Sequence, residues 1–316
     1  MSGDTVTVAP KRATPPAAPK KKKQPVQMQE TILHKRTPVG KIVTWVVLAI
    51  WIVWTLAPLV ITGLASIKTT REAFATPEYG DWGGVTKIFE FSPTSVHFKR
   101  LFTQEGFGSY IWHGLVASVG SALIAVIMGT LGAYGLSRGK FRREGDISFW
   151  IISTRMAPAV VVIVPLYYIF RSFGMLSTLP GLIVAYTTFN LSFSLWLIKG
   201  FFDDLPIEIE EAAHVDGDSH WAVFRKVAVP LAAPGIVAAF VLCVLFSWND
   251  FLFAAVIGGH RAKTVPVGIT ELRTTVEVLW GPINSATIIL IIPMIALGIL
   301  IRKYLIQGLT MGAVRE

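Results

Sequence analysis

The stretch PIEIEEAAHVDGDSHWAVFRKVAVPLAAP, residues 206–234, decides how the rest of this chain is organised. It is polar and acidic, and it lies between two long apolar segments. Between Lys199 and Pro234 there are seven acidic residues against three basic ones. A chain that is otherwise mostly apolar therefore keeps about one helical hairpin for an aqueous environment.

The hairpin has a recognisable local pattern. Its first part, 207–214, is rich in Glu and Ala, which favour helix. Gly217 can break this helix without a steric penalty, and Asp218 or Ser219 can cap a second helix. Trp221, Phe224 and Val227 follow at three-residue spacing, Pro230 is expected to end this helix, and Pro234 fits the first turn of the next span.

The composition indicates an integral membrane protein. Of the 316 residues, 53% are hydrophobic and 16% are charged, against roughly 25% charged in soluble domains. The net charge is +9, but residues 1–41 hold nine Lys/Arg and two Asp/Glu. The basic charge therefore belongs to a tail, which we expect to be disordered over 1–40, and it does not indicate nucleic-acid binding. The single cysteine, Cys243, lies in an apolar run and forms no metal motif.

Six apolar segments are long enough to cross a bilayer core, which needs about 20 residues. They make residues 41–316 an all-α, polytopic membrane domain. Polar segments at 67–110 and 258–282 connect spans outside the membrane. The predicted spans are 42–61, 111–135, 147–170, 179–198, 236–257 and 283–301, the third interrupted by Arg155, Pro158 and Pro165.

The distribution of Lys and Arg predicts the orientation. The side that holds both termini carries 19 of these residues and the other side carries nine. Both termini and the 206–234 hairpin are therefore expected in the cytoplasm.

Two places inside the predicted spans carry polar groups. Arg155 is costly in an apolar span, so it should face the bundle interior or a water-filled path, or reach the cytoplasmic interface. Asp250 has no evident partner nearby in sequence and, with Asn249, either lines a pathway or bonds another helix. Trp248 and Phe251 could offer an aromatic face to a sugar. We expect Arg155, Trp248, Asn249 and Asp250 to line a translocation pathway.

From the residues alone, the hairpin could equally dock into a partner or simply connect two spans. Its spacing, however, resembles the EAA signature of ABC importer permeases. The rest of the chain from Ile42 to Glu316 resembles the carbohydrate-type permeases, in particular the smaller partner of maltose-type importers. The signature residues are Glu211-Ala212-Ala213, Asp216-Gly217, Phe224, Pro230-Leu231 and Pro234. The wider resemblance rests on Ala133-Tyr134, Ser137-Arg138, Arg155-Met156-Ala157-Pro158, Pro165-Leu166-Tyr167, Trp248-Asn249-Asp250-Phe251, Gln307-Gly308-Leu309-Thr310 and Gly312-Ala313-Val314.

The resemblance implies that the hairpin is a coupling helix docked in a cleft of a cytoplasmic ABC ATPase dimer. Glu211 would be its polar contact, Ala212 and Ala213 would permit close approach, and Asp216-Gly217 would make the corner; Asp218 replaces the family's frequent alanine. It also implies a second permease chain, a periplasmic solute-binding protein, a bacterial inner-membrane location and alternating access. The binding protein would touch 67–110 and 258–282.

The sequence carries no phosphate loop of the form G-x-x-x-x-G-K-[ST]. ATP and Mg²⁺ are therefore expected on the partner ATPase, with no cofactor, metal site or catalytic residue in this chain. His214 and His220 lack the helical i, i+4 spacing of a metal pair. Two other classes remain open at this point: a secondary transporter coupled through Arg155 and Asp250, and a membrane-embedded enzyme. The sequence does not identify the solute: sugar, oligosaccharide, polyol and glycerol-type cargo all remain open.

Overall fold

The computed structural model describes residues 38–69, 91–139, 141–273 and 278–312, with side chains up to Arg302. Regular structure in this part is helical, apart from one isolated antiparallel bridge between Arg273 and Val278. Five of the described helices are long and apolar enough to span a membrane, and a bent helix pair makes a sixth span. The predicted all-α, six-span class is confirmed.

Contacts divide the chain into two units, one ending at Ala57 and one beginning at Pro58. The first unit includes most of α1 (Pro38–Ser66), which continues through Pro58 and begins three residues before the predicted boundary at 41. Its side chains are apolar on all sides, as in a helix surrounded by lipid or by other membrane helices. The predicted tail before Pro38 lies outside the described residues.

The core of the second unit is the packing of α5 (Phe107–Arg138) against α8 (Leu179–Asp203). Small residues recur every fourth position along one buried face of α5: Ala117, Ser121, Ala125, Gly129 and Ala133. Small residues let membrane helices approach closely, which replaces the hydrophobic drive that lipid cannot supply. A β-carbon added at Gly129 would lie 2.5 Å from the Ser194 hydroxyl oxygen, so this contact depends on glycine.

The third span is broken, as its Arg and Pro content predicted. Helix α6 (Glu144–Ser153) continues into the short 3₁₀ turn η1 (Thr154–Met156), and α7 (Ala159–Ser172) follows at an angle of 91°. Pro158, at the amino-terminal cap of α7, has φ −57° and ψ 128° and cannot continue the helix. The break leaves two residues of extended backbone between the two halves.

The hairpin helices are α9 (Ile207–Val215) and α10 (His220–Val223). The expectation that Pro230 ends the second helix is wrong. A five-residue π turn, η2 (Phe224–Ala228), joins α10 directly to α11 (Val229–Trp248). The N–H of Val229 bonds to the Phe224 carbonyl five residues back, and this wider turn accommodates the ring of Pro230 without a break.

The predicted fifth span, 236–257, is also wrong at both ends, because the continuous helix runs from His220 to Trp248. After Trp248 the chain turns, and a second π segment, η3 (Ala254–Gly258), lies against α7 and α8. Asp250 explains the turn: its carboxylate accepts the backbone N–H of Phe253 at 2.8 Å. The expectation that Asp250 lacks a nearby partner is therefore wrong.

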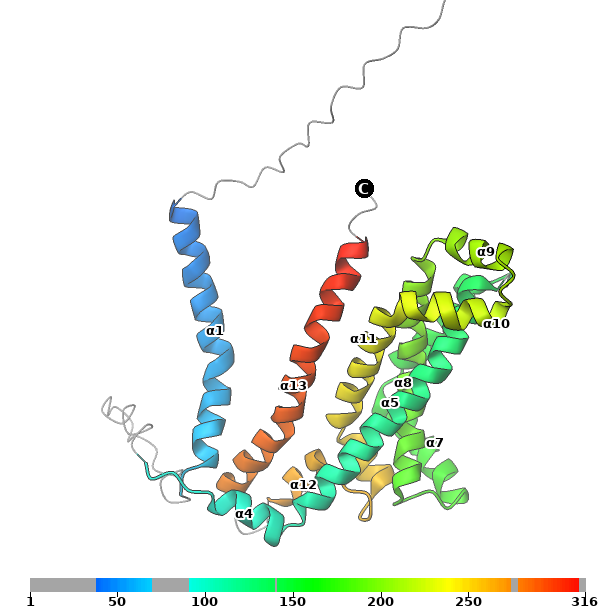
Figure 1. Cartoon of the computed structure of the whole chain (residues 1–316). Helices are drawn as coiled ribbons and strands as arrows, with labels where there is room; N and C mark the ends of the chain where they lie inside the picture. Colours follow the sequence, from blue (N-terminus) through cyan, green and yellow to red (C-terminus); the bar gives the residue numbers. More distant parts are fainter. Residues whose placement is uncertain (1–37, 70–90, 140, 274–277, 313–316) are drawn as a thin grey trace, which may run out of the picture. The chain divides into compact units, whose positions relative to one another are not determined.

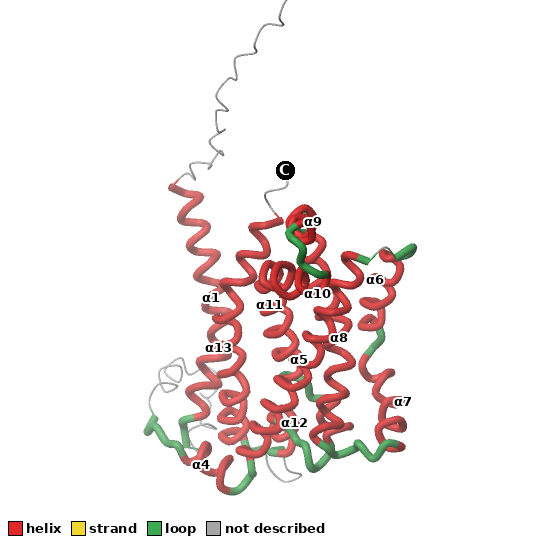
Figure 2. The backbone as a smooth tube through the Cα atoms, turned by 45° about the vertical axis from the view of Figure 1, so that its right-hand side comes forward, coloured by secondary structure: helices red, strands yellow, loops and turns green. Residues whose placement is uncertain are grey.

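Different elements lie at the two ends of the second unit. The carboxyl end of α13 (Trp280–Gly312) lies at the same end as the hairpin, and α4 (Val96–Thr103) and α12 (Val265–Glu271) lie at the opposite end (Figure 1). The backbone trace shows the same arrangement from another side (Figure 2). In the connecting segment 67–110 the structure describes the short helix α4, and residues 70–90 lie outside the described part.

Candidate functional site

The hairpin turns sharply because its corner residue has the geometry of glycine. Gly217 has φ +94°, a conformation that residues with a side chain rarely adopt. The Ser219 hydroxyl then caps α10 by accepting the N–H of Ala222 at 3.3 Å, so Ser219 and not Asp218 is the cap. Asp218, directly after the corner, forms an ion pair with Lys226 of η2 at 2.7 Å. His214 and His220 pack edge to face, with ring centroids 4.5 Å apart.

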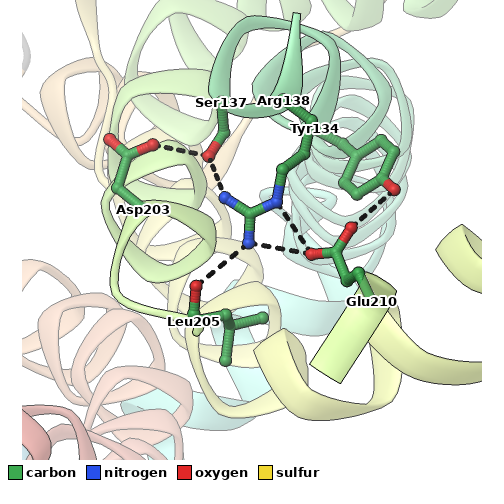
Figure 3. A network of polar contacts seen from close by, with 6 residues as sticks. All are labelled: Tyr134, Ser137, Arg138, Asp203, Leu205 and Glu210. Carbon is green, nitrogen blue, oxygen red and sulfur yellow. Dashed lines mark hydrogen bonds and ion pairs between the residues drawn. The ribbon is translucent and has the colours of Figure 1, made fainter. Parts of the chain in front are cut away.

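A buried ion pair attaches the hairpin to the membrane helices (Figure 3). Arg138, the last residue of α5, donates from Nε and Nη2 to one carboxylate oxygen of Glu210, each at 2.8 Å. Tyr134, one turn earlier on α5, donates its hydroxyl to the other carboxylate oxygen at 2.8 Å. The side chains of Arg138 and Glu210 are only 15% and 6% exposed.

The same arginine also holds the segment that leads into the hairpin. Its Nη2 donates to the Leu205 carbonyl at 3.2 Å, and its Nη1 donates to the Ser137 hydroxyl at 3.0 Å. Ser137 in turn donates to Asp203 at the end of α8. We call Tyr134, Arg138 and Glu210 the joint, because these three side chains tie α9 to the end of α5.

The residues predicted to contact an ATPase lie away from the joint. Glu211, Ala212, Asp216 and Gly217 are exposed, and Ala213 is half-buried. The exposed surface also carries large apolar side chains: Val215 is 87% exposed and Trp221 is 61% exposed. Apolar side chains beside acidic ones on an exposed helix are typical of a surface that a partner covers.

Sequence reasoning missed the joint. Glu210 and Glu211 are adjacent and chemically identical, and only the tertiary contacts show that the first is buried and the second exposed. Tyr134 and Arg138 contributed to the family resemblance without an assigned role. An arginine at the end of one span and an acidic helix after another are the available signals, and neither identifies the pairing.

The structure brings two of the four predicted pathway residues together. Arg155 and Asp250 both line a cavity of about 270 Å³, and Trp248 and Asn249 are not in its lining. The Trp248 side chain is buried and donates to the Leu290 carbonyl at 2.9 Å, and the Asn249 amide donates to the Leu245 carbonyl at 2.9 Å. The cavity is lined by Arg155, Ala157, Ala159, Tyr186, Phe189, Asn190, Phe246, Ser247, Asp250 and Phe253.

The fold and the hairpin define the class of this protein as the permease subunit of an ABC importer. The family model described as "binding-protein-dependent transport system inner membrane component" matches residues 123–310, and the chain belongs to this family. The secondary transporter and the membrane-embedded enzyme are not supported by any of these findings.

Curated relatives match over most of the chain. An inner membrane ABC transporter permease protein of Escherichia coli, YcjP, is 31% identical over 285 residues, covering 89% of this chain and 99% of the relative. The trehalose transport system permease protein SugB of Mycobacterium tuberculosis is 32% identical over 232 residues, covering 72% and 85%. A crystal structure of a bacterial ABC transporter involved in alginate import shares the fold, with a TM-score of 0.66, 21% identity and coverage of 84% of this chain and 96% of that chain.

Proposed function

We propose that this chain forms half of the translocation pathway of a carbohydrate importer, together with a second permease chain. The support comes from the named solutes of its relatives, which include trehalose for SugB and diacetylchitobiose for the DasC protein of Streptomyces coelicolor. A periplasmic binding protein would deliver the sugar, as the family description implies. A pair of separate ATPase subunits would bind ATP and Mg²⁺, and this chain would perform no catalysis.

The hairpin is the proposed docking element for the ATPase. The observation that carries this assignment is the division of α9 into two faces. Glu210 is buried in an ion pair with the end of α5, whereas Glu211 and Ala212, one position further, are exposed. A helix fixed to the membrane domain on one side and open on the other can pass a displacement from a bound partner to the spans.

The joint provides the mechanical path. Motion of the ATPase dimer would displace α9, and the contacts of Arg138 with Glu210 and Leu205 would carry the displacement to α5. Helix α8 would move with it, because α5 and α8 pack tightly through small residues. The spans would then alternate between inward-open and outward-open states.

The proposed orientation places the hairpin and both termini in the cytoplasm. The carboxyl end of α13 and the hairpin share one end of the second unit, and the Lys/Arg distribution favours the cytoplasm for it (Figure 1). The binding protein would approach the other end, where α4 and α12 lie.

Transport by the reconstituted importer tests this proposal. Proteoliposomes would contain this chain with its partner permease, ATPase and binding protein, and uptake of ¹⁴C-labelled trehalose, maltose and diacetylchitobiose would be measured with and without ATP. We expect ATP-dependent uptake of at least one sugar, lost in Glu211→Arg and kept in Asp146→Asn, a matched exposed acid on α6. Uptake that needs an ion gradient in place of ATP, or that survives Glu211→Arg unchanged, would contradict the proposal.

A further inference from the structure

The cavity beside Arg155 lies where the third span is broken. Its wall includes Ala157 from the break and Ala159 from the first turn of α7. Ala157 and Pro158 have extended backbone, with ψ of 128° for both. Irregular backbone at membrane depth is stable where it is buried in protein or lines a polar cavity, because lipid cannot satisfy its N–H and C=O groups. Broken helices of this kind mark binding sites in membrane transporters.

Two polar groups of this cavity, Arg155 and the Tyr186 hydroxyl, have no hydrogen-bond partner within the described residues, whereas Asn190 donates to the Ser247 hydroxyl at 2.8 Å. The Arg155 guanidinium lies over the rings of Phe193 and Phe246, 5.0 Å from each centroid. Within the described residues it makes no ion pair and no hydrogen bond. The Tyr186 hydroxyl is near enough to Asp250 to interact with its charge but lies outside hydrogen-bond geometry, so among the residues that the structure describes it is buried without a hydrogen-bond partner. Buried polar groups are nearly always bonded, so an unmet group in a cavity indicates a ligand or water.

Aromatic rings supply the apolar part of the cavity. Phe189 and Phe253 pack with ring centroids 4.5 Å apart, and Phe246 stands beside Arg155. Donors and acceptors at some points and aromatic faces at others match a sugar ring, which has hydroxyls around its edge and C–H groups on its faces. One guanidinium and one carboxylate together favour a neutral solute over a charged one. The volume of about 270 Å³ is just below that of typical ligand pockets, roughly 300–1,000 Å³, and suits a single sugar ring.

We propose that this cavity binds one neutral, hydroxyl-rich ring of the transported solute, so that this chain contacts the solute directly. Tyr186 and Arg155 would donate to sugar hydroxyls, Asp250 would accept from one, and Phe189 or Phe246 would cover a ring face. The inference rests on the proposed importer function and adds a binding subsite to it.

The test must bypass the binding protein, because that protein selects the solute first and governs the apparent KM of uptake. The importer in nanodiscs, without its binding protein, would be trapped with ATP and vanadate. Binding of the sugar that the wild-type importer transports in the uptake assay above would be followed by saturation-transfer difference NMR, which detects weak binding and reports which ring protons contact protein. Tyr186→Phe removes only the unpartnered hydroxyl, and Thr188→Val is the matched control on α8, since Thr188 is exposed and bonds only the Val184 carbonyl.

We expect Tyr186→Phe to weaken binding three- to tenfold, the effect of one hydrogen bond, and Thr188→Val to bind like wild type. Ala159→Leu, which fills the cavity, should abolish the signal. A monodeoxy analogue lacking the contacted hydroxyl should bind wild type and Tyr186→Phe equally, as a double-mutant cycle requires. Unchanged binding in both Tyr186→Phe and Ala159→Leu would overturn the inference while ATP-driven uptake still supported the importer function; absent uptake would instead refute the function itself.

Discussion

The joint and the cavity place charged groups in opposite ways. In the joint, Arg138 and Glu210 neutralise each other, and Tyr134 satisfies the remaining carboxylate oxygen. In the cavity, Arg155 and Asp250 line the same space, but neither is paired with an opposite charge within the described residues. Both regions bury polar chemistry in a chain that is otherwise mostly apolar.

The contrast separates two uses of a buried charge. A paired and fully bonded charge holds two elements in one geometry, because breaking the pair leaves an uncompensated charge in a low-dielectric interior. A charge without a counter-charge keeps hydrogen-bonding capacity for a ligand: Arg155 bonds nothing within the described residues, and Asp250 accepts the Phe253 N–H and still faces the cavity. We therefore expect substitutions in the joint to change stability and substitutions in the cavity to change binding.

The largest loss of stability should come from Glu210→Ala. It leaves the Arg138 guanidinium mostly buried without its counter-charge, so the free energy of unfolding should fall by about 3 kcal/mol. Glu211→Ala, the matched control one residue away, should stay within about 0.5 kcal/mol of wild type because Glu211 is exposed. Unfolding of the purified chain in detergent measures both.

The double variant Arg138→Met/Glu210→Met sharpens this first prediction. Replacing both partners by apolar side chains of similar length removes the charge and its solvation cost together, so much of the lost stability should return. Transport should not return with it, if the joint passes movement from α9 to α5. A double variant as unstable as Glu210→Ala would show that the bonds to Leu205 and Ser137, and not the ion pair, hold the hairpin.

Gly217→Ala should have the next largest effect. An alanine at φ +94° is strained, and we expect a loss of about 1–2 kcal/mol in the same unfolding measurement. Gly200→Ala on α8 is the control, since no atom lies within 4 Å of its added β-carbon and its backbone is helical. An unchanged stability of Gly217→Ala would mean that the corner relaxes without the left-handed conformation.

The parts of this fold that depend on local chemistry were predictable from the sequence. Apolar segment length predicted six spans, the Pro and Arg content predicted a break in the third, and Gly217 predicted the corner. The π turn before Pro230 was not predictable in this way, because a proline normally ends a helix and only the surrounding packing shows that this helix continues.

In the candidate site, too, local sequence features were predictable and tertiary contacts were not. The motif spacing pointed to Glu211, but the burial of Glu210 depends on Arg138, which is 72 residues away in sequence. Arg155 and Asp250 could be identified as unusual charges inside apolar segments. That they line one cavity, and that Tyr186 and Asn190 join them, follows only from the packing of the broken third span against α8.

Tyr134→Phe tests the joint with a smaller change. It removes the hydroxyl that donates to Glu210 and keeps the ring, which packs against Phe202 and Phe224. Because Glu210 keeps its two bonds from Arg138, we expect a loss of about 1.5 kcal/mol, the lower end of the range for a hydrogen bond to a charged group. Tyr168→Phe, at an exposed tyrosine on α7, should be neutral in the same assay.

The smallest effect on stability should come from Tyr186→Phe in the cavity. The hydroxyl that it removes is buried but has no hydrogen-bond partner among the described residues, so folding loses no bond and avoids a desolvation cost. We expect the free energy of unfolding to change by less than about 0.5 kcal/mol in either direction. Tyr134→Phe is the natural comparison, because the same chemical change is made at a hydroxyl that is bonded. A loss in Tyr186→Phe as large as that in Tyr134→Phe would show that Tyr186 holds Asp250 in place in the empty protein. The cavity would then be a second structural joint, and its polar groups would not be available to a solute.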